Sequence, residues 1–210
     1  MSAPFPAGFF DRSDDGDDSR FYTPDRFVTH IDRGAIDAVG ALYDELALAG
    51  DVLDIMSSWV SHFRQAPRNL VVLGMNEREL AANPQAASWA TCDLNDEPTL
   101  PFVTASFDAV TCCVSVDYLV RPIEVFEEVA RVLRPGGAFV VTFSNRCFPT
   151  KAIRGWLGTD DAGHVAIVRD YFARTSCFDP ARDAMRIPAG AGTDPLFAVW
   201  ALRRDHTDTE

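Results

Sequence analysis

Residues 107–143 read FDAVTCCVSVDYLVRPIEVFEEVARVLRPGGAFVVTF, and this stretch decides the fold. The apolar run over 107–115 is typical of a strand that is covered on both faces of its sheet. Pro122 suits the first position of a helix, and apolar side chains then recur at helical spacing: Ile123, Phe126, Val129, Ala130 and Leu133. Pro135-Gly136-Gly137 ends this helix, and a second apolar strand follows over 138–143. A strand, a helix and a strand in this order predict a parallel unit.

The same alternation extends in both directions from this unit. Apolar runs predict further strands over 52–55, 70–73 and 88–91, with a helix over 77–83. On the other side we expect helices over 150–157 and 165–174 and strands over 184–187 and 196–202. This regularity predicts an α/β protein with a doubly wound, mostly parallel sheet and helices on both faces. Ligands of such sheets bind beyond the carboxyl ends of the strands.

Composition limits the class of protein. The 210 residues fit one domain, and 47% of them are hydrophobic, which is enough for a full core. The formal net charge of −12 argues against nucleic acid as a partner, because phosphate binding needs clustered Lys and Arg. No apolar run is long enough to span a membrane, and the N-terminus lacks the pattern of a secretory signal. The five cysteines include no Cys-x-x-Cys, the spacing typical of a metal site. A cytoplasmic protein without membrane or metal is the simplest interpretation.

The region before the first strand divides into two parts. Residues 1–20 are expected to form a flexible acidic segment, since DRSDDGDD at 11–18 offers little apolar surface. Residues 21–50 show apolar side chains at helical spacing and predict one helical region or two helices broken near Asp32-Arg33-Gly34. The main domain is expected over 51–203, followed by a flexible tail over 204–210.

Three stretches resemble the class I S-adenosylmethionine-dependent methyltransferases. The most specific is Ser106-Phe107-Asp108-Ala109-Val110 with EVFEEVARVLRPGG at 124–137. The second is Cys92-Asp93-Leu94 followed by Leu100-Pro101-Phe102, and the third is Val52-Leu53-Asp54-Ile55. The strings LDIMSSWVSH, VSVDYL and SNRCFPTK are similar to a little-characterised branch of the type 11 methyltransferases. The resemblance covers about residues 50–145 and implies a seven-stranded Rossmann-like sheet.

The resemblance implies S-adenosylmethionine as cofactor and assigns residues to its site. Asp93 matches the family's acidic residue near the adenine amino group, with Leu94 at the ring edge. Asp54 ends the first strand, although a helix cap is its alternative role. Met75 either covers an adenine face or belongs to the core. The cofactor residues expected on this basis are Asp54, Met56, Ser57, Met75, Asn76, Asp93, Leu94 and Ser115.

Two features depart from the family pattern. The first loop reads Met56-Ser57-Ser58-Trp59-Val60-Ser61, although the family's loop is glycine-rich so that the backbone approaches the cofactor closely. The second is Asn76, an amide at the position of the family's ribose-binding carboxylate. Asn76 and the serine hydroxyls would replace some of these contacts.

Candidate catalytic and acceptor residues follow from position in the chain. Asp117 and Tyr118 follow the fourth strand, where the methyl group and the acceptor would meet; an N-cap and a packing role are their alternatives. His30 is a candidate general base or a structural histidine. Arg146 and Lys151, in the polar loop after the fifth strand, would hold an anionic acceptor group, or the loop is simply solvated. The acceptor residues expected are Tyr22, Arg26, Asn145, Arg146 and Lys151.

The sequence thus predicts methyl transfer to a small-molecule acceptor. A non-catalytic domain of the same fold that supports a partner protein is the alternative, and the glycine-free first loop favours it. A nicotinamide-dependent oxidoreductase is disfavoured, because no Gly-x-Gly-x-x-Gly follows the first strand and Tyr118 has no lysine four residues later.

Overall fold

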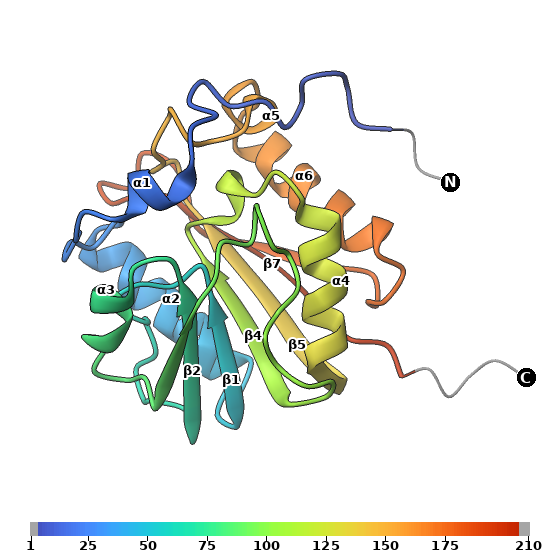
Figure 1. The fold of residues 1–210 in the computed structure, drawn as a ribbon. Coiled ribbons are helices and arrows are strands. Elements are labelled where there is room, and N and C mark those ends of the chain that lie inside the picture. Colours follow the sequence, from blue (N-terminus) through green and yellow to red (C-terminus); the bar gives the residue numbers. More distant parts are fainter. Residues whose placement is uncertain (1–3, 206–210) are drawn as a thin grey trace, which may run out of the picture.

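The computed structural model describes residues 4–205, which form a seven-stranded sheet between two helical layers (Figure 1). Parallel strands fill most of the sheet, and the last strand in the chain is antiparallel to its two neighbours. The strand order is β3-β2-β1-β4-β5-β7-β6. The strands are β1 (Asp51–Ile55), β2 (Asn69–Gly74), β3 (Ser88–Thr91), β4 (Phe107–Cys113), β5 (Leu133–Phe143), β6 (Arg182–Ile187) and β7 (Leu196–Leu202). The predicted α/β fold class and doubly wound architecture are confirmed.

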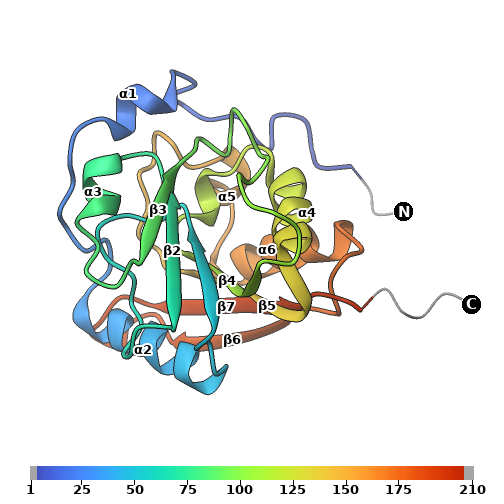
Figure 2. The ribbon, with the colours of Figure 1, turned by 60° about the horizontal axis from the view of Figure 1, so that its bottom comes forward.

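Helices cover the two faces of the sheet unequally (Figure 2). One face carries α4 and α6, and the other carries α2. The short helices lie at the ends of the strands or in the connections. The helices are α1 (Asp18–Tyr22), α2 (Arg33–Glu45), α3 (Glu77–Ala81), the short 3₁₀ helix η1 (Val116–Tyr118), α4 (Pro122–Val132), α5 (Arg154–Leu157) and α6 (Asp161–Arg174). Among residues 4–205, no helix is long and apolar enough to cross a membrane.

Local sequence explains where the main helices begin. Pro122 starts α4, whose buried side includes Phe126 and Val129. Asp160 caps α6 by accepting a hydrogen bond from the Gly163 amide. Leu133, expected at the end of the helical stripe, instead begins β5, so the Pro-Gly-Gly turn lies inside this strand. Gly136 there has φ +75°, a conformation that glycine adopts without strain.

Residues 21–50 hold one long helix and an irregular segment. Asp32 caps α2 through the Ala35 amide, as expected for a break near residues 32–34. The residues between α1 and α2 are not helical, so the expectation of helix before the break was wrong. They cross the carboxyl ends of the strands and cover this end of the sheet (Figure 1).

The N-terminal segment differs from the expectation of a flexible acidic tail. Phe5, Phe9 and Phe10 form an aromatic cluster that contacts Tyr171 of α6. Asp18 is buried between Arg12 and Lys151, at 2.7 and 2.9 Å. The prediction rested on the acidic run alone and missed these cationic and aromatic partners. Residues 1–3 and 206–210, the ends of the two segments expected to be flexible, lie outside the described residues.

Candidate functional site

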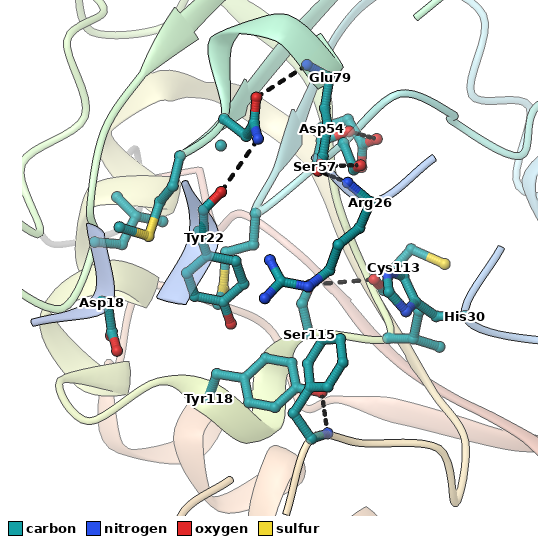
Figure 3. Close-up of a pocket in the computed structure, with 18 of the residues that line it drawn as sticks. Asp18, Tyr22, Arg26, His30, Asp54, Ser57, Glu79, Cys113, Ser115 and Tyr118 are labelled. Carbon is teal, nitrogen blue, oxygen red and sulfur yellow. Dashed lines mark hydrogen bonds between the residues drawn. The ribbon is translucent and has the colours of Figure 1, made fainter. Parts of the chain in front are cut away.

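A pocket lies at the carboxyl ends of β1, β2 and β4, where the strand order reverses (Figure 3). It has a volume of about 1160 Å³, its open mouth included. Side chains from the segment Asp18–His30 line its outer wall. All eight residues predicted for the cofactor line this one pocket: Asp54, Met56, Ser57, Met75, Asn76, Asp93, Leu94 and Ser115.

Asp54 is the buried centre of a group of hydroxyls at the floor of the pocket. Ser57, Ser61 and Thr111 each donate a hydrogen bond of 2.7 Å to its carboxylate. Thr111 faces Asp54 because the two residues are paired in the register of β1 and β4. Burial raises the pKa of Asp54, and the three hydroxyl donors oppose that change. The carboxylate therefore fixes the shape of the first loop from below.

The first loop has the backbone of a glycine-containing turn without the glycine. Met56 has φ +52°, in the left-handed region. The Ser57 amide donates to the Leu73 carbonyl at 2.8 Å, which ties the loop to the end of β2. A Cβ on Gly74 would collide with the Ser57 carbonyl, so this close approach needs glycine in β2.

Asn76 lines the pocket but is fully engaged by the protein. Its Oδ1 accepts hydrogen bonds from the Arg78 and Glu79 amides and so caps α3. Its Nδ2 donates to the Tyr22 carbonyl and to the Asp25 carboxylate, each at 3.1 Å. The predicted ribose contact would thus compete with bonds that hold the segment Asp18–His30, called the covering segment below because it lies over the pocket. Glu79, one turn later, accepts from the Arg26 amide at 2.6 Å and from the Ser58 hydroxyl at 2.5 Å.

The loop after β3 forms the opposite wall. Asp93 accepts a hydrogen bond from the Asn95 amide at 2.9 Å, and partial burial raises its pKa. Leu94 is buried beside it. The Asn95 side chain donates to Asp18 and to the Tyr118 carbonyl, each at 3.0 Å. Asn95 therefore joins this wall to the covering segment and to η1.

Only two of the three predicted catalytic residues lie in the pocket. His30 and Tyr118 line the pocket, whereas Asp117 does not. The Tyr118 hydroxyl accepts a hydrogen bond of 2.8 Å from the Phe148 amide, which leaves its proton free to be donated. Asp117 is buried, its Oδ2 has no hydrogen-bond partner among the described residues, and burial raises its pKa to about 8. Asp117 is not positioned to touch a molecule in this pocket.

Of the five residues predicted to bind the acceptor, two line the pocket and three do not. Tyr22 and Arg26 line the pocket, but Asn145, Arg146 and Lys151 do not. Arg146 is exposed and pairs with Asp194 at 2.8 Å. Lys151 is only 1% exposed and binds Asp18, Asp14 and two backbone carbonyls of the N-terminal segment. Their partners lie far away in the chain, so the loop after β5 gave no sign that these charges were already neutralised.

Two imidazoles line the pocket. Burial, together with a smaller effect of the His30 charge, lowers the pKa of His62 to about 4. Burial also lowers the pKa of His30, with Glu79 opposing and Arg26 reinforcing the change. Both side chains are therefore uncharged at neutral pH. His62 was missed by sequence reasoning because it lies in an irregular connection between β1 and β2.

Glu79 and Phe148 were missed as well. The helical position of Glu79 would have been a usable signal, since it places the side chain one turn beyond the carboxyl end of β2. Phe148 comes after β5 and contacts Phe21, His30 and Tyr118. No local pattern marks it. Within residues 4–205, no three or more His, Cys, Asp or Glu side chains are grouped to hold a metal ion.

The fold and the position of the pocket define a class I, Rossmann-like methyltransferase architecture. The model of the methyltransferase domain family matches residues 47–141 of this chain. A solved S-adenosylmethionine-dependent methyltransferase of Mesorhizobium loti is similar in fold, with a TM-score of 0.55 and 16% identity over 80% of this chain and 100% of its own. The phosphoethanolamine N-methyltransferase 2 of Haemonchus contortus, solved with S-adenosyl-L-methionine, has a TM-score of 0.55 and 14% identity over 87% of this chain and 61% of its own.

Curated relatives are similar over shorter segments. The ubiquinone/menaquinone biosynthesis C-methyltransferase of Roseobacter denitrificans is 36% identical over 35% of this chain and 28% of its own length. The malonyl-[acyl-carrier protein] O-methyltransferase of a Marinomonas species is 28% identical over 41% of this chain and 31% of its own length. The chain thus covers less than a third of each of these two relatives.

Proposed function

We propose that this protein transfers a methyl group from S-adenosylmethionine to a small-molecule acceptor. The observation that carries the proposal is the convergence of eight separately predicted cofactor residues, from four loops, on one pocket. The similar relatives, a ubiquinone/menaquinone biosynthesis C-methyltransferase and a malonyl-[acyl-carrier protein] O-methyltransferase, support the same reaction class.

The residues of the pocket fit an adenosyl sulfonium cofactor. Four carboxylates line the pocket (Asp18, Asp54, Glu79 and Asp93) against one guanidinium, that of Arg26. This balance suits a ligand with a sulfonium and an ammonium group. The left-handed Met56 and the glycine of β2 keep the narrow turn that the family's first loop provides. When bound, the cofactor would supply a methyl group activated by the positive sulfur.

The protein's own part would be alignment and exclusion of water. The segment Asp18–His30 covers the pocket and is bonded to α3 and to the loop after β3. His30 and His62 are uncharged and would accept a proton from an acceptor that arrives protonated. The Tyr118 hydroxyl would donate a hydrogen bond to the acceptor.

Calorimetric titration with S-adenosylmethionine and S-adenosylhomocysteine, with NADH as control, tests the proposal. We expect the adenosyl compounds alone to bind with micromolar affinity, about −8 kcal/mol. Formation of S-adenosylhomocysteine in an acceptor screen would then identify the reaction.

A non-catalytic domain that supports a partner protein is the second candidate. It is favoured by Asn76, whose amide is engaged by α3 and the covering segment and is not free for a ribose. Absence of adenosyl binding in the same titration would reject the enzyme and leave this function.

A further inference from the structure

Arg26 is a cation without a counter-ion inside the pocket. In Figure 3 its side chain extends into the middle of the site, between Tyr22 and His30. Its guanidinium donates to the Phe21 carbonyl at 2.6 Å and to the Pro24 carbonyl at 3.2 Å. Five N–H groups belong to a guanidinium, so three remain for a ligand. Among residues 4–205, no carboxylate lies within ion-pair distance of it, and it is the only Arg or Lys that lines the pocket.

The carboxylates of the pocket have other partners. Asp18 binds Arg12 and Lys151, and Asp54 accepts from three hydroxyls. Asp93 accepts from a backbone amide. The Glu79 carboxylate accepts from the Ser58 hydroxyl and the Arg26 backbone amide. None of these four carboxylates forms an ion pair with Arg26, whose guanidinium is therefore the one unpaired Arg or Lys charge among the described residues that line the pocket.

Three aromatic rings hold this guanidinium in place. Its central carbon lies 4.6 Å from the ring centroid of Phe21, 5.6 Å from Phe148 and 5.9 Å from Tyr22. Such surroundings keep a guanidinium weakly hydrated and orient its flat donor edge. Phe148 follows β5 and lies next to Tyr118, which follows β4. These loops form the side of the pocket where the acceptor would meet the methyl group.

We propose that the methyl acceptor is an anion, a carboxylate or a phosphate with a flat apolar body, and that the Arg26 guanidinium binds its charged group. This inference rests on the proposed function and names the substrate class of the same site. The flat body would lie along Phe148 and Tyr118, and the charged group would accept hydrogen bonds from the free N–H groups of Arg26. Arg146 and Lys151, expected for this role from the sequence, are neutralised by other carboxylates.

The carboxylate of the cofactor is the competing ligand for Arg26. Two binding experiments distinguish it from an anionic acceptor. The first compares S-adenosylhomocysteine with 5′-methylthioadenosine, which lacks the amino-acid part, on the wild type and on Arg26→Ala, Arg26→Lys and Arg146→Ala. The second titrates the S-adenosylhomocysteine-loaded proteins with benzoate, phenyl phosphate and the uncharged benzamide. Melting curves check that each variant is folded.

We expect benzoate or phenyl phosphate, but not benzamide, to bind the loaded wild type. Arg26→Ala should lose this binding by about tenfold or more while S-adenosylhomocysteine still binds, because a charge-assisted fork is removed. Arg26→Lys should restore only part of the affinity, since an ammonium lacks the planar fork. The matched control Arg146→Ala should behave as wild type.

Three results would overturn the inference. One is binding of neither anion to the loaded wild type, and another is equal binding of benzamide. The third is a loss of S-adenosylhomocysteine affinity in Arg26→Ala with methylthioadenosine unchanged, which would assign Arg26 to the cofactor's carboxylate. Failure of the proposed function is seen separately, as no adenosyl binding by the wild type, and the inference would fall with it.

Discussion

Two residues that line the pocket have a positive φ, which residues other than glycine rarely adopt. Met56 follows β1 with φ +52°, and Val114 follows β4 with φ +48°. For a non-glycine residue this region costs on the order of 1–3 kcal/mol, and such strain gathers at functional sites. Hydrogen bonds maintain both turns, from the Ser57 amide to Leu73 and from the Val114 amide to Thr142. The first loop therefore adopts a left-handed turn at a residue that is not glycine.

The left-handed conformation of Met56 predicts which of two substitutions gives the more stable protein. Met56→Gly should be more stable than Met56→Ala by about 1 kcal/mol, because alanine strains at positive φ and glycine does not. Both variants remove nearly the same side chain, so each serves as the control of the other. Urea unfolding measures the difference. Greater stability of the alanine variant, the usual order at negative φ, would contradict the left-handed turn.

The raised pKa of Asp117 predicts how the free energy of unfolding depends on pH. Its folded-state pKa of about 8 exceeds the ordinary value of 3.8, so the folded protein holds a proton that the unfolded chain releases. The free energy of unfolding therefore falls as pH rises between these values. Asp117→Asn should remove this dependence and raise stability near neutral pH by a few kcal/mol at most, about 1.4 kcal/mol per pH unit crossed.

Urea unfolding of Asp117→Asn and wild type, at about pH 5 and pH 8, tests this linkage. The gain should be larger at the higher pH. S-adenosylhomocysteine affinity should be unchanged, because Asp117 does not line the pocket. A loss of affinity without a change in stability would return Asp117 to the site that the sequence suggested.

At the scale of elements, the covering segment Asp18–His30 is held on two sides. Asn76 and Glu79 of the α3 region bind the Tyr22 carbonyl and the Arg26 amide. On the other side Asn95 binds Asp18. The segment has a single short helix and few buried apolar side chains, so these polar bonds set its position.

Replacement of Asn76 tests this attachment. Asn76→Asp can still cap α3, but it turns a donor into an acceptor that faces the Tyr22 carbonyl and the Asp25 carboxylate. We expect faster hydrogen exchange in residues 18–30 and a loss of about 1–3 kcal/mol in local stability. Asn83→Asp, which changes a bond within the main domain, is the matched control and should leave residues 18–30 protected. Unchanged exchange in Asn76→Asp would show that Asn76 does not hold the covering segment in place.

The elements of the sheet could be predicted from the sequence, and the contacts between distant segments could not. Hydrophobic runs located all seven strands, two of them (88–91 and 196–202) with the bounds that the structure has. Motif positions led to eight residues that line one pocket, where the cofactor is predicted to bind, because the carboxyl ends of parallel strands meet there. Lys151 and Arg146 were misplaced because their partners, Asp18 and Asp194, are distant in the chain and nothing local marks the pairing.

At the scale of the whole molecule, one buried carboxylate attaches the N-terminal segment. Burial alone would raise the pKa of Asp18, but bonds from Arg12, Lys151 and Asn95 outweigh it and hold the pKa below the ordinary 3.8. A depressed pKa gives stability that is present above the unfolded value and lost as pH falls through the folded value. The attachment should therefore fail in acid.

Limited proteolysis and hydrogen exchange of residues 4–22 between about pH 6 and pH 2 measure this attachment. We expect protection at the upper end and release below the ordinary Asp pKa, while the sheet remains protected over part of that range. Asp18→Asn, which cannot ionise, should be less protected throughout and show a weaker pH dependence. A release curve identical to that of wild type would mean that other groups control the segment.

The position of β7 between β5 and β6 has a consequence for biosynthesis. A ribosome makes β5 and β6 before it makes residues 196–202, yet these two strands do not pair with each other and are connected in the sheet only through β7. A nascent chain that ends before residue 196 therefore exposes one open edge of β5 and an unpaired β6. Such edges recruit other strands, so a chain whose translation pauses in this region would be prone to aggregation until β7 pairs with both strands.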